Sequence, residues 1–373
     1  MQDGLEGVVA ARTTLSHVDG ERGELIIAGF PVAEMAAHAT FEETVWLLWH
    51  GDLPDAATLA AFRADLARRR ELPAYAIDLL RACAHDRIDV MDALRIGAGT
   101  IAASAEAAPA EILAKCPTIV AAYWQLRHGR APVAPRADLG HAANYLYMLT
   151  GAAPAPEEIR GLETYLNTVV DHGLNASTFT ARIITSTGSD LVSAIVGALG
   201  ALKGPLHGGA PGPALDMVFE IGDAANAEPI LRRKIESGER LMGFGHRVYK
   251  VRDPRADVLA AAAERMFTRG GDMRLYQLAR AVEATALRLL EEYKPGRRLQ
   301  TNVEFYTALL LHGLGLETAL FTPTFAVGRV GGWIAHSIEQ RAANRIIRPQ
   351  SEYVGPRDRS WVPVDQRSPV SAG

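Results

Sequence analysis

Cysteine is scarce in this chain, and so are long apolar runs and any strong excess of one charge. Cys83 and Cys116 are the two cysteines among 373 residues, too few for a disulfide framework, which indicates a reducing compartment. The longest apolar run, Leu191–Leu202, is too short to span a bilayer, and the opening MQDGLEGVVAARTT lacks the apolar core of a signal peptide. A net charge of −4 gives no overall field favouring nucleic acid or an anionic membrane. We therefore expect a cytoplasmic protein that binds neither.

The signatures of common cofactor-binding folds are missing as well. The GxG pattern at Gly243 and Gly245 has neither a third glycine nor a preceding strand, so a dinucleotide-binding fold is not expected. The sequence contains no P-loop, no HExxH, no pair of CxxC motifs and no GxSxG elbow. We expect no bound cofactor and no metal.

Helical periodicity dominates the chain, and the alternation typical of half-buried strands is scarce. Asp55 and Asp190 stand where helix N-caps are expected, directly before apolar helical patterns. The spacing of apolar residues predicts helices over residues 55–70, 157–170, 191–203, 255–267, 273–293 and 301–314. One extended stretch, Glu24–Ile27, predicts a small hairpin near the N-terminus. The predicted fold class is mainly α, without internal repeats.

Three of the eleven histidines lie beside glycines or tight turns: His172 in DHGLNAST, His207 in GPLHGGAP and His246 in GFGHRVYK. A single loop histidine is often a structural residue whose hydrogen bonds are satisfied. However, glycine lets a backbone come close to a ligand, and a loop leaves an imidazole accessible. On these grounds alone, the structural and the ligand-binding interpretations both stay open.

Arginines gather near the third of these histidines. The cluster consists of Arg247, Lys250, Arg252 and Arg255. It is either a solvated helix start or a site for carboxylates and phosphates, which the guanidinium fork matches well. Arg329 in TFAVGRVGGW and Arg348 before Pro349 stand apart. An arginine among apolar residues and glycines is costly to bury alone, so Arg329 needs either an internal acidic partner or an anionic substrate.

Glu304, in TNVEFYTALLLHGL, lies near the start of a strongly apolar helical segment. A carboxylate at this position interacts favourably with the positive end of the helix dipole. Alternatively, apolar surroundings raise its pKa and make it a competent general base. The spacing does not decide between these two roles.

Together these segments resemble the citrate synthase family, in its short bacterial and archaeal form. GFGHRVYKVRDPR, from Gly243 to Arg255, matches the family signature residue by residue. Around it lie HGLNASTF, GALKGPLHGGAP, NVEFY, FTPTFAVGRVGGWIAH and the RP of Arg348, in the order and spacing of the family. The opening GLEGVVAARTTLSHVDGERGELI and the closing WVPVDQR are also similar to this form. The resemblance covers nearly the whole chain.

The resemblance implies an almost all-helical, two-domain homodimer. The large domain would comprise residues 1–207 and 309–373, and the small domain, residues 208–308, would close over the substrates. Arg348 would reach the active site of the partner subunit. The last segment, residues 356–373, would wrap the partner, whereas its composition alone is equally compatible with a frayed end.

The resemblance also implies roles for individual residues. The resemblance implies that CoA is contacted by Arg247, Val248 and Lys250. Oxaloacetate would be bound by His172, His246, Arg255, Arg329 and Arg348. The CoA thioester is a co-substrate, so no cofactor is bound. The implied reaction is the citrate synthase reaction of the tricarboxylic acid cycle, an acyl transfer that joins acetyl-CoA to oxaloacetate. A 2-methylcitrate synthase using propionyl-CoA is the nearest alternative, because one methylene is worth only about 1–3 kcal/mol in a pocket.

In this reaction the weakly acidic methyl group of the thioester must lose a proton while its oxygen is stabilised. Glu304 takes that proton in the implied mechanism. His207 donates to the thioester oxygen, a kind of support worth about 3 kcal/mol per donor in other enzymes. His246 polarises the ketone of oxaloacetate and protonates the new alkoxide.

Two departures from the family pattern stand out. Glu304 occupies a position where most members carry aspartate, as NVDFY, and a displaced carboxylate can cost about 10²-fold in rate. IIAGFPV replaces a YRGY-like segment.

Two other classes of protein remain as alternatives. One is a zinc protein built on the three loop histidines, although the neighbouring arginines would repel a metal cation. The other is a non-catalytic scaffold that binds CoA.

Overall fold

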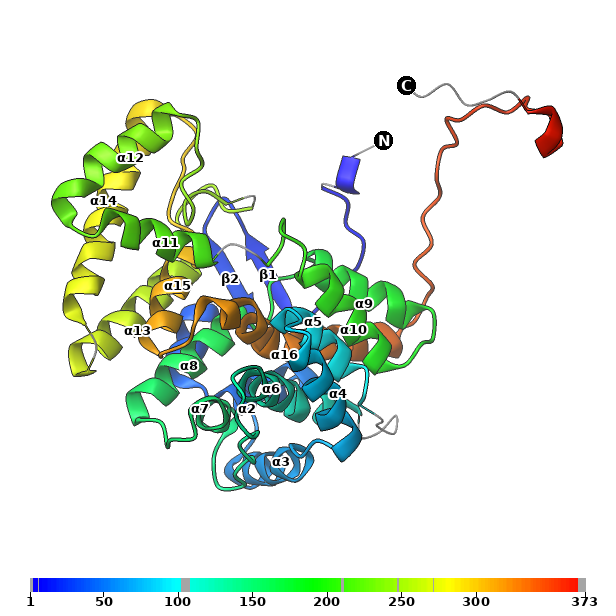
Figure 1. The fold of residues 1–373 in the computed structure, drawn as a ribbon, viewed down its shortest axis with the longest axis horizontal. Coiled ribbons are helices and arrows are strands. Elements are labelled where there is room, and N and C mark those ends of the chain that lie inside the picture. Colours follow the sequence, from blue (N-terminus) through cyan, green and yellow to red (C-terminus); the bar gives the residue numbers. More distant parts are fainter. Residues whose placement is uncertain are drawn as a thin grey trace.

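Helices account for most of the protein, as the sequence predicts (Figure 1). The computed structural model describes residues 3–5, 7–101, 108–208, 211–246, 248–270 and 272–367. Within this part of the chain lie sixteen α-helices, four short 3₁₀ turns and one small antiparallel sheet. The 3₁₀ turns are η1 (Asp3–Leu5), η2 (Ala224–Asn226), η3 (Thr318–Leu320) and η4 (Val364–Gln366). The mainly α fold class is confirmed.

The sheet lies near the N-terminus and has three strands. They are β1 (Ser16–Asp19), β2 (Glu24–Ile27) and β3 (Phe30–Pro31). β1 and β2 form the predicted hairpin, with Ser16 opposite Ile27. A tight turn at Ala28 and Gly29, both with positive φ, then reverses the chain into β3. The unusual IIAGFPV segment therefore forms this second turn.

Eleven helices form the larger body of the molecule. They are α1 (Val32–His38), α2 (Phe41–His50), α3 (Ala56–Arg69), α4 (Ala74–His85), α5 (Val90–Ala98), α6 (Ala108–Arg127), α7 (His141–Thr150), α8 (Pro156–Val169), α9 (Ala176–Ser186), α10 (Leu191–Leu202) and α16 (Phe321–Ala342). Asp55 and Asp190 cap α3 and α10, because each carboxylate accepts a backbone N–H three residues later. The capping predicted from the sequence is confirmed at both helices.

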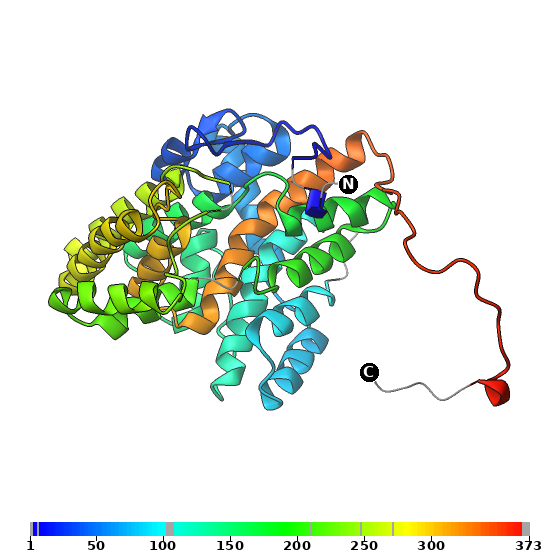
Figure 2. The same ribbon diagram turned by 90° about the horizontal axis from the view of Figure 1, so that it is seen from above.

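The other five helices lie together on one side of this body (Figures 1 and 2). They are α11 (Pro211–Ile221), α12 (Ala227–Glu236), α13 (Pro254–Gly270), α14 (Met273–Tyr293) and α15 (Val303–Gly313). α13 contacts α8 of the larger body, and α13 and α15 contact each other. This grouping is compatible with a small domain at residues 208–308, which stays a prediction.

Helix α16 crosses the middle of the molecule and is buried along most of its length (Figure 1). It contacts α2, α6, α8, α9 and α10. Glycines permit this closeness: a Cβ on Gly332 would lie 2.1 Å from the carbonyl oxygen of Val170, and one on Gly328 would lie 2.7 Å from Val169. The chain that leaves α8 is therefore held against α16, directly before Asp171 and His172.

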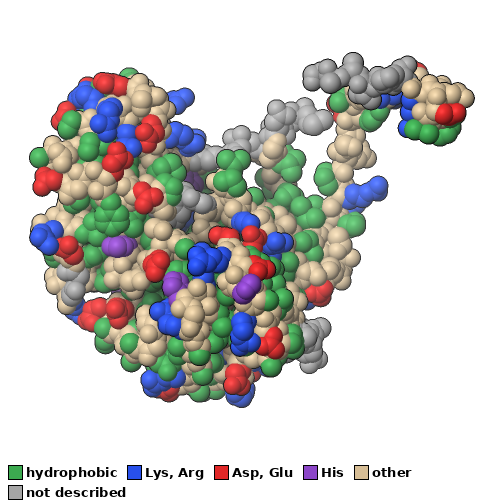
Figure 3. Space-filling view, in the orientation of Figure 1, with side chains coloured by type: hydrophobic (Ala, Val, Ile, Leu, Met, Phe, Trp, Pro, Cys, Tyr) green, Lys and Arg blue, Asp and Glu red, His purple; other side chains and the backbone are tan. Residues whose placement is uncertain are grey.

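Residues 348–367 leave the body as an extended tail (Figure 2). Most of its side chains are exposed, including the aromatic rings of Tyr353 and Trp361. Acidic and basic side chains are interspersed over the face in Figure 3, as the small net charge suggests. Among the described residues, no helix is both long and apolar enough to cross a membrane.

The contact between α16 and the end of α8 can be tested at Gly332. Gly332→Ala places a methyl group against the Val170 carbonyl, so we expect a loss of about 1–3 kcal/mol in urea denaturation. Gly161→Ala is the matched control, because a Cβ there meets side chains at an ordinary 3.6 Å and alanine favours the helix by up to about 1 kcal/mol. Equal stability of the two variants would contradict this packing.

Candidate active site

A cavity of about 860 Å³ collects most of the residues singled out from the sequence. Its walls come from the N-terminal segment, the loops around residues 172–180 and 206–207, the 246–255 segment and the starts or faces of three helices. The predicted residues that line it are His172, His207, His246, Val248, Arg255, Glu304 and Arg329. These positions lie up to 157 residues apart in the chain, so the fold brings them together.

Arg255 begins the cationic wall of this cavity at the first turn of α13. Its side chain is only 4% exposed and forms a two-pronged pair with Asp253, with Nε–Oδ1 and Nη2–Oδ2 distances of 3.0 and 2.8 Å. Asp253 also accepts the backbone N–H of Val303, which joins the start of α13 to the start of α15. Although burial opposes it, the Asp253 carboxylate raises the pKa of Arg255, so the guanidinium is charged and fixed.

His246 is presented by a backbone that bends at Gly243 and Gly245, both with positive φ. Its Nδ1 accepts the backbone N–H groups of Val248 and Tyr249 at 3.0 and 3.1 Å. Burial first, then the nearby Arg255 charge, lowers the pKa of His246 to about 4, so the ring is neutral at pH 7. Because Nδ1 accepts, the single ring proton is on Nε2.

This proton assignment leaves two donors facing each other. The Nε2 of His246 lies 3.3 Å from Nη2 of Arg255, and a guanidinium only donates. The pair therefore calls for an oxygen that accepts from both groups. A carbonyl or carboxylate oxygen of a ligand fits that requirement.

His207 has the opposite proton arrangement. Its Nε2 lies 2.8 Å from the Ser177 hydroxyl and accepts the Ser177 backbone N–H at 3.3 Å. Trp333 Nε1 in turn donates to the Ser177 hydroxyl oxygen. Burial and the Arg329 charge lower the pKa of His207 to about 4. Because Nε2 accepts the Ser177 backbone N–H, the neutral ring carries its proton on Nδ1.

His172 completes the histidine set at the end of the segment that follows α8. Its Nε2 lies 3.1 Å from the Tyr249 hydroxyl, and its ring centroid is 5.9 Å from that of His246. Burial, then the charges of Arg255 and Arg329, keep the pKa of His172 well below its usual value. All three histidines are thus neutral at physiological pH.

Glu304 stands on the first turn of α15. Asn302 caps this helix, because its Oδ1 accepts the Glu304 backbone N–H at 3.0 Å while its amide donates to the Gly245 carbonyl. Burial raises the pKa of the Glu304 carboxyl to about 7, against the opposing influence of Arg255. The carboxyl is therefore poised to gain or lose a proton near neutral pH, as a general base requires.

Arg329 is the most deeply buried charge of the cavity wall. It is 1% exposed, its Nε donates to the Val169 carbonyl at 2.5 Å, and it stacks on Phe325 with 4.7 Å to the ring centroid. Among the described residues it makes no ion pair within 4.0 Å, and burial lowers its pKa to about 10. An internal carboxylate, Asp253, pairs with Arg255, whereas the nearby Asp171 carboxylate acts on Arg329 without forming an ion pair, so an anionic ligand for Arg329 stays a prediction.

The remaining predicted residues lie elsewhere. Arg348 is exposed in the extended segment after α16 and does not line the cavity. Lys250 is exposed, and its backbone N–H donates to the Gly20 carbonyl at 2.8 Å. Arg247 lies outside the described residues.

Several residues of the site were not predicted individually. They are Asn175, Ser177, Tyr249, Asp253, Asn302 and Phe325. Asp253 stands two residues before Arg255, and Asn302 stands two residues before Glu304, so pairing and capping rules point to both. Ser177 and Tyr249 act on histidines far away in the sequence, and no local pattern identifies them.

The histidines are not arranged as a zinc-binding set. The ring nitrogens His207 Nε2 and His246 Nδ1 accept protein N–H groups, and the neighbouring charges are arginines. In the part of the chain that the structure describes, no group of three or more His, Cys, Asp or Glu side chains is close enough to hold a metal ion.

Comparisons with known proteins show which family the chain is similar to. The family model described as "Citrate synthase, C-terminal domain" matches residues 4–350. The citrate synthase of Haloferax volcanii is 40% identical, with 98% of this chain and 99% of that protein aligned. A 2-methylcitrate synthase of Mycobacterium tuberculosis is 38% identical over 96% of this chain and 92% of its own length.

Solved structures give the same result. The crystal structure of citrate synthase from Thermotoga maritima superposes with a TM-score of 0.87 at 39% identity, covering 99% of each chain. The Thermoplasma acidophilum citrate synthase, solved as a ternary complex with carboxymethyl coenzyme A and oxaloacetate, gives 0.89 at 30% identity, covering 98% of this chain and 99% of that one. Because sequence, fold and the ordered motifs agree over nearly the full length, the chain belongs to the citrate synthase family.

Proposed function

We propose that this protein is a citrate synthase, an acyltransferase that condenses acetyl-CoA with oxaloacetate and water to give citrate and CoA. The observation that carries the proposal is the composition of the cavity wall. The wall contains Glu304, whose carboxyl has a pKa of about 7, together with two neutral imidazole donors and two buried guanidinium groups. A base, donors for a developing oxyanion and a clamp for a dianion are the parts that this condensation needs.

Oxaloacetate is the partner for the cationic wall. Its two carboxylates would bind to Arg329, whose charge they neutralise, and to Arg255, which is already paired with Asp253. His172 would be a further hydrogen-bond donor or acceptor. Its ketone oxygen would lie between His246 Nε2 and Arg255 Nη2, where two donors now face each other. Binding would thus supply the acceptor that these two donors need, and it would orient the ketone for attack.

The reaction of acetyl-CoA then has three steps. Glu304 removes a methyl proton while the Nδ1–H of His207 stabilises the thioester oxygen as it becomes an enolate. The enolate carbon attacks the ketone of oxaloacetate, forming the new C–C bond, and His246 Nε2–H gives its proton to the alkoxide. Water finally cleaves the thioester of the condensed product, which releases citrate and the CoA thiol.

Closure of the predicted small domain, residues 208–308, would exclude water until the C–C bond has formed. Val248 lines the cavity beside His246, which supports its predicted place near CoA. In this proposal Arg247 and Lys250 meet the phosphates of CoA. The homodimer, the cytoplasmic location and the domain boundaries stay predictions.

The reaction itself is tested by thiol release. The purified protein mixed with oxaloacetate and acetyl-CoA should release free CoA thiol, and omission of oxaloacetate should abolish the release. Release no greater than this background would favour a CoA-binding scaffold.

The acyl preference is tested by comparing kcat/KM for acetyl-CoA with kcat/KM for propionyl-CoA. We expect the two values to differ by about 10- to 200-fold at most, in favour of acetyl-CoA. A clear preference for propionyl-CoA would make the protein a 2-methylcitrate synthase.

The base is tested by changing Glu304 alone. Glu304→Gln keeps the size of the side chain and removes the base, so we expect kcat to fall by about 10²- to 10⁴-fold. Glu304→Asp is the matched control, because it keeps the carboxylate and only displaces it, and we expect a smaller loss. Since the ionised carboxylate is the active form, wild-type kcat/KM should rise with pH through about 7. Full activity of Glu304→Gln would refute the assigned role.

The predicted dimer is tested at Arg348. This residue is exposed on the extended tail, which is compatible with its predicted contact with the cavity of a partner subunit. We expect a dimer by light scattering, and we expect Arg348→Gln to raise KM for oxaloacetate while Arg359→Gln, on the same exposed tail, leaves it unchanged. An active monomer, or equal KM values for the two variants, would contradict this arrangement.

A further inference from the structure

Tyr249 lies at the point where three of the residues predicted to bind oxaloacetate meet. It is 3% exposed, and it is not among the residues that line the main cavity. Its hydroxyl oxygen lies 3.1 Å from Nε2 of His172. Its ring centroid lies 4.8 Å from that of the His246 ring and 5.8 Å from the guanidinium carbon of Arg255. One buried side chain therefore contacts groups from both chain segments that carry the candidate site.

The backbone around Tyr249 is held by the hairpin near the N-terminus. The Lys250 backbone N–H donates to the Gly20 carbonyl at 2.8 Å, and a Cβ on Gly20 would lie 2.2 Å from the Val248 carbonyl oxygen. The turn between β1 and β2 therefore packs directly on both neighbours of Tyr249 in the chain. This contact fixes the backbone from which the tyrosine ring extends toward His246.

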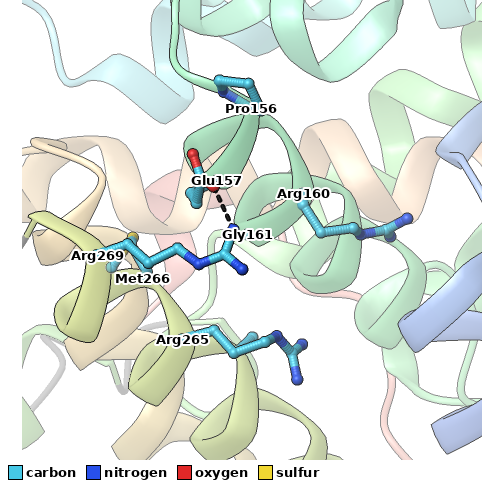
Figure 4. A pocket seen from close by; sticks show the side chains of 8 residues that line it. Pro156, Glu157, Arg160, Gly161, Arg265, Met266 and Arg269 are labelled. Carbon is cyan, nitrogen blue, oxygen red and sulfur yellow. Dashed lines mark hydrogen bonds and ion pairs between the residues drawn. The ribbon is translucent and has the colours of Figure 1, made fainter.

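Helices α8 and α13 lead to the two segments that Tyr249 contacts. The helices pack against each other, and at the end remote from the main cavity Arg269 of α13 pairs with Glu157 of α8 (Figure 4). At the opposite end, His172 follows α8 and Arg255 lies in the first turn of α13. The hydrogen bond between Tyr249 and His172 joins the two segments at this end, one after α8 and the other before α13.

The direction of this hydrogen bond follows from the groups around it. The lowered pKa of His172 leaves its ring neutral, so one ring nitrogen donates and the other accepts. Arg255 and Arg329, whose charges act on this ring, only donate. Among the described residues, Nε2 of His172 is the one hydrogen-bond partner of the Tyr249 hydroxyl, and a buried hydroxyl proton without an acceptor is costly. The hydroxyl therefore donates to Nε2, and the His172 proton lies on Nδ1.

We propose that Tyr249 is a positioning residue for oxaloacetate, which holds the His172 ring and fixes its proton on Nδ1 before the substrate binds. This inference rests on the proposed function, in which His172 contacts oxaloacetate. The same residue also sets the second histidine, because its backbone N–H donates to Nδ1 of His246 and so places that proton on Nε2. The side chain and the backbone of one residue thus fix the tautomers of two histidines. Rings that are already oriented lose less freedom when the substrate binds.

The hydrogen bond is tested in the free protein by NMR of nitrogen-labelled histidine rings, each assigned from the signals lost in His172→Gln or His246→Gln. We expect the wild type to carry the His172 proton on Nδ1. In Tyr249→Phe the His172 Nε2 resonance should move, because that nitrogen loses its donor, whereas the His246 resonances should stay, because the backbone N–H is retained. A wild-type proton on His172 Nε2, or an unmoved Nε2 resonance in the variant, would overturn the proposal. The measurement needs no catalysis, so failure of this hydrogen bond and failure of the proposed function give different results.

The positioning role is tested by the dependence of thiol release on oxaloacetate. Tyr249→Phe should raise KM for oxaloacetate about tenfold and leave KM for acetyl-CoA within about twofold, because the lost hydrogen bond acts on a ring that contacts oxaloacetate. Tyr145→Phe is the matched control, because its hydroxyl forms a buried hydrogen bond with Thr324 at 3.0 Å and lies outside the cavity lining. We expect this control to lose comparable stability in urea denaturation and to keep the wild-type KM for oxaloacetate. Equal KM values for oxaloacetate in the two variants would make Tyr249 a structural residue only and overturn the proposal.

Discussion

A fully buried guanidinium that forms no ion pair with any described carboxylate is the constraint around which the main cavity is organised. Arg329 lies on the central helix α16, is 1% exposed, and is held by the Val169 carbonyl and the Phe325 ring. Removing a charge from water costs several kcal/mol, and these contacts offset that cost only in part. The same charge contributes to keeping His172 and His207 neutral. In the proposed function, an anionic substrate would supply a partner for this charge, which is why we expect the cavity to bind a dianion.

The ends of several helices position the other cavity residues around Arg329. His172 follows the end of α8, and Arg255 lies in the first turn of α13. Glu304 lies in the first turn of α15, which Asn302 caps, and Arg329 lies on α16. The two carboxylates next to these arginines differ in their surroundings. Asp253 is paired with Arg255 and stays ionised, whereas Glu304 forms no ion pair with a described residue and its pKa rises to about 7. Environment, and not residue type, separates the structural acid from the candidate base.

Much of the fold follows from local rules that act on the sequence. Asp55 and Asp190 cap their helices as predicted, and Met273–Tyr293 is helical over the predicted range. Helix α15 starts two residues later than predicted, because the Asn302 side chain takes the capping position. The ordered motifs identified seven of the cavity residues, since catalysis restricts their types. The sequence could not show that Ser177 fixes the His207 proton or that Asp253 neutralises Arg255 while Arg329 stays unpaired, because those facts depend on contacts between distant segments.

The central claim is that burial, outweighing two nearby arginines, holds the Glu304 carboxyl at a pKa of about 7 in the free protein. Infrared difference spectra of wild type against Glu304→Gln, recorded across a pH series without substrates, observe this one carboxyl group directly. The account predicts that its protonated carbonyl band disappears with a midpoint at about pH 7. A midpoint near the ordinary glutamate value of about 4 would contradict it.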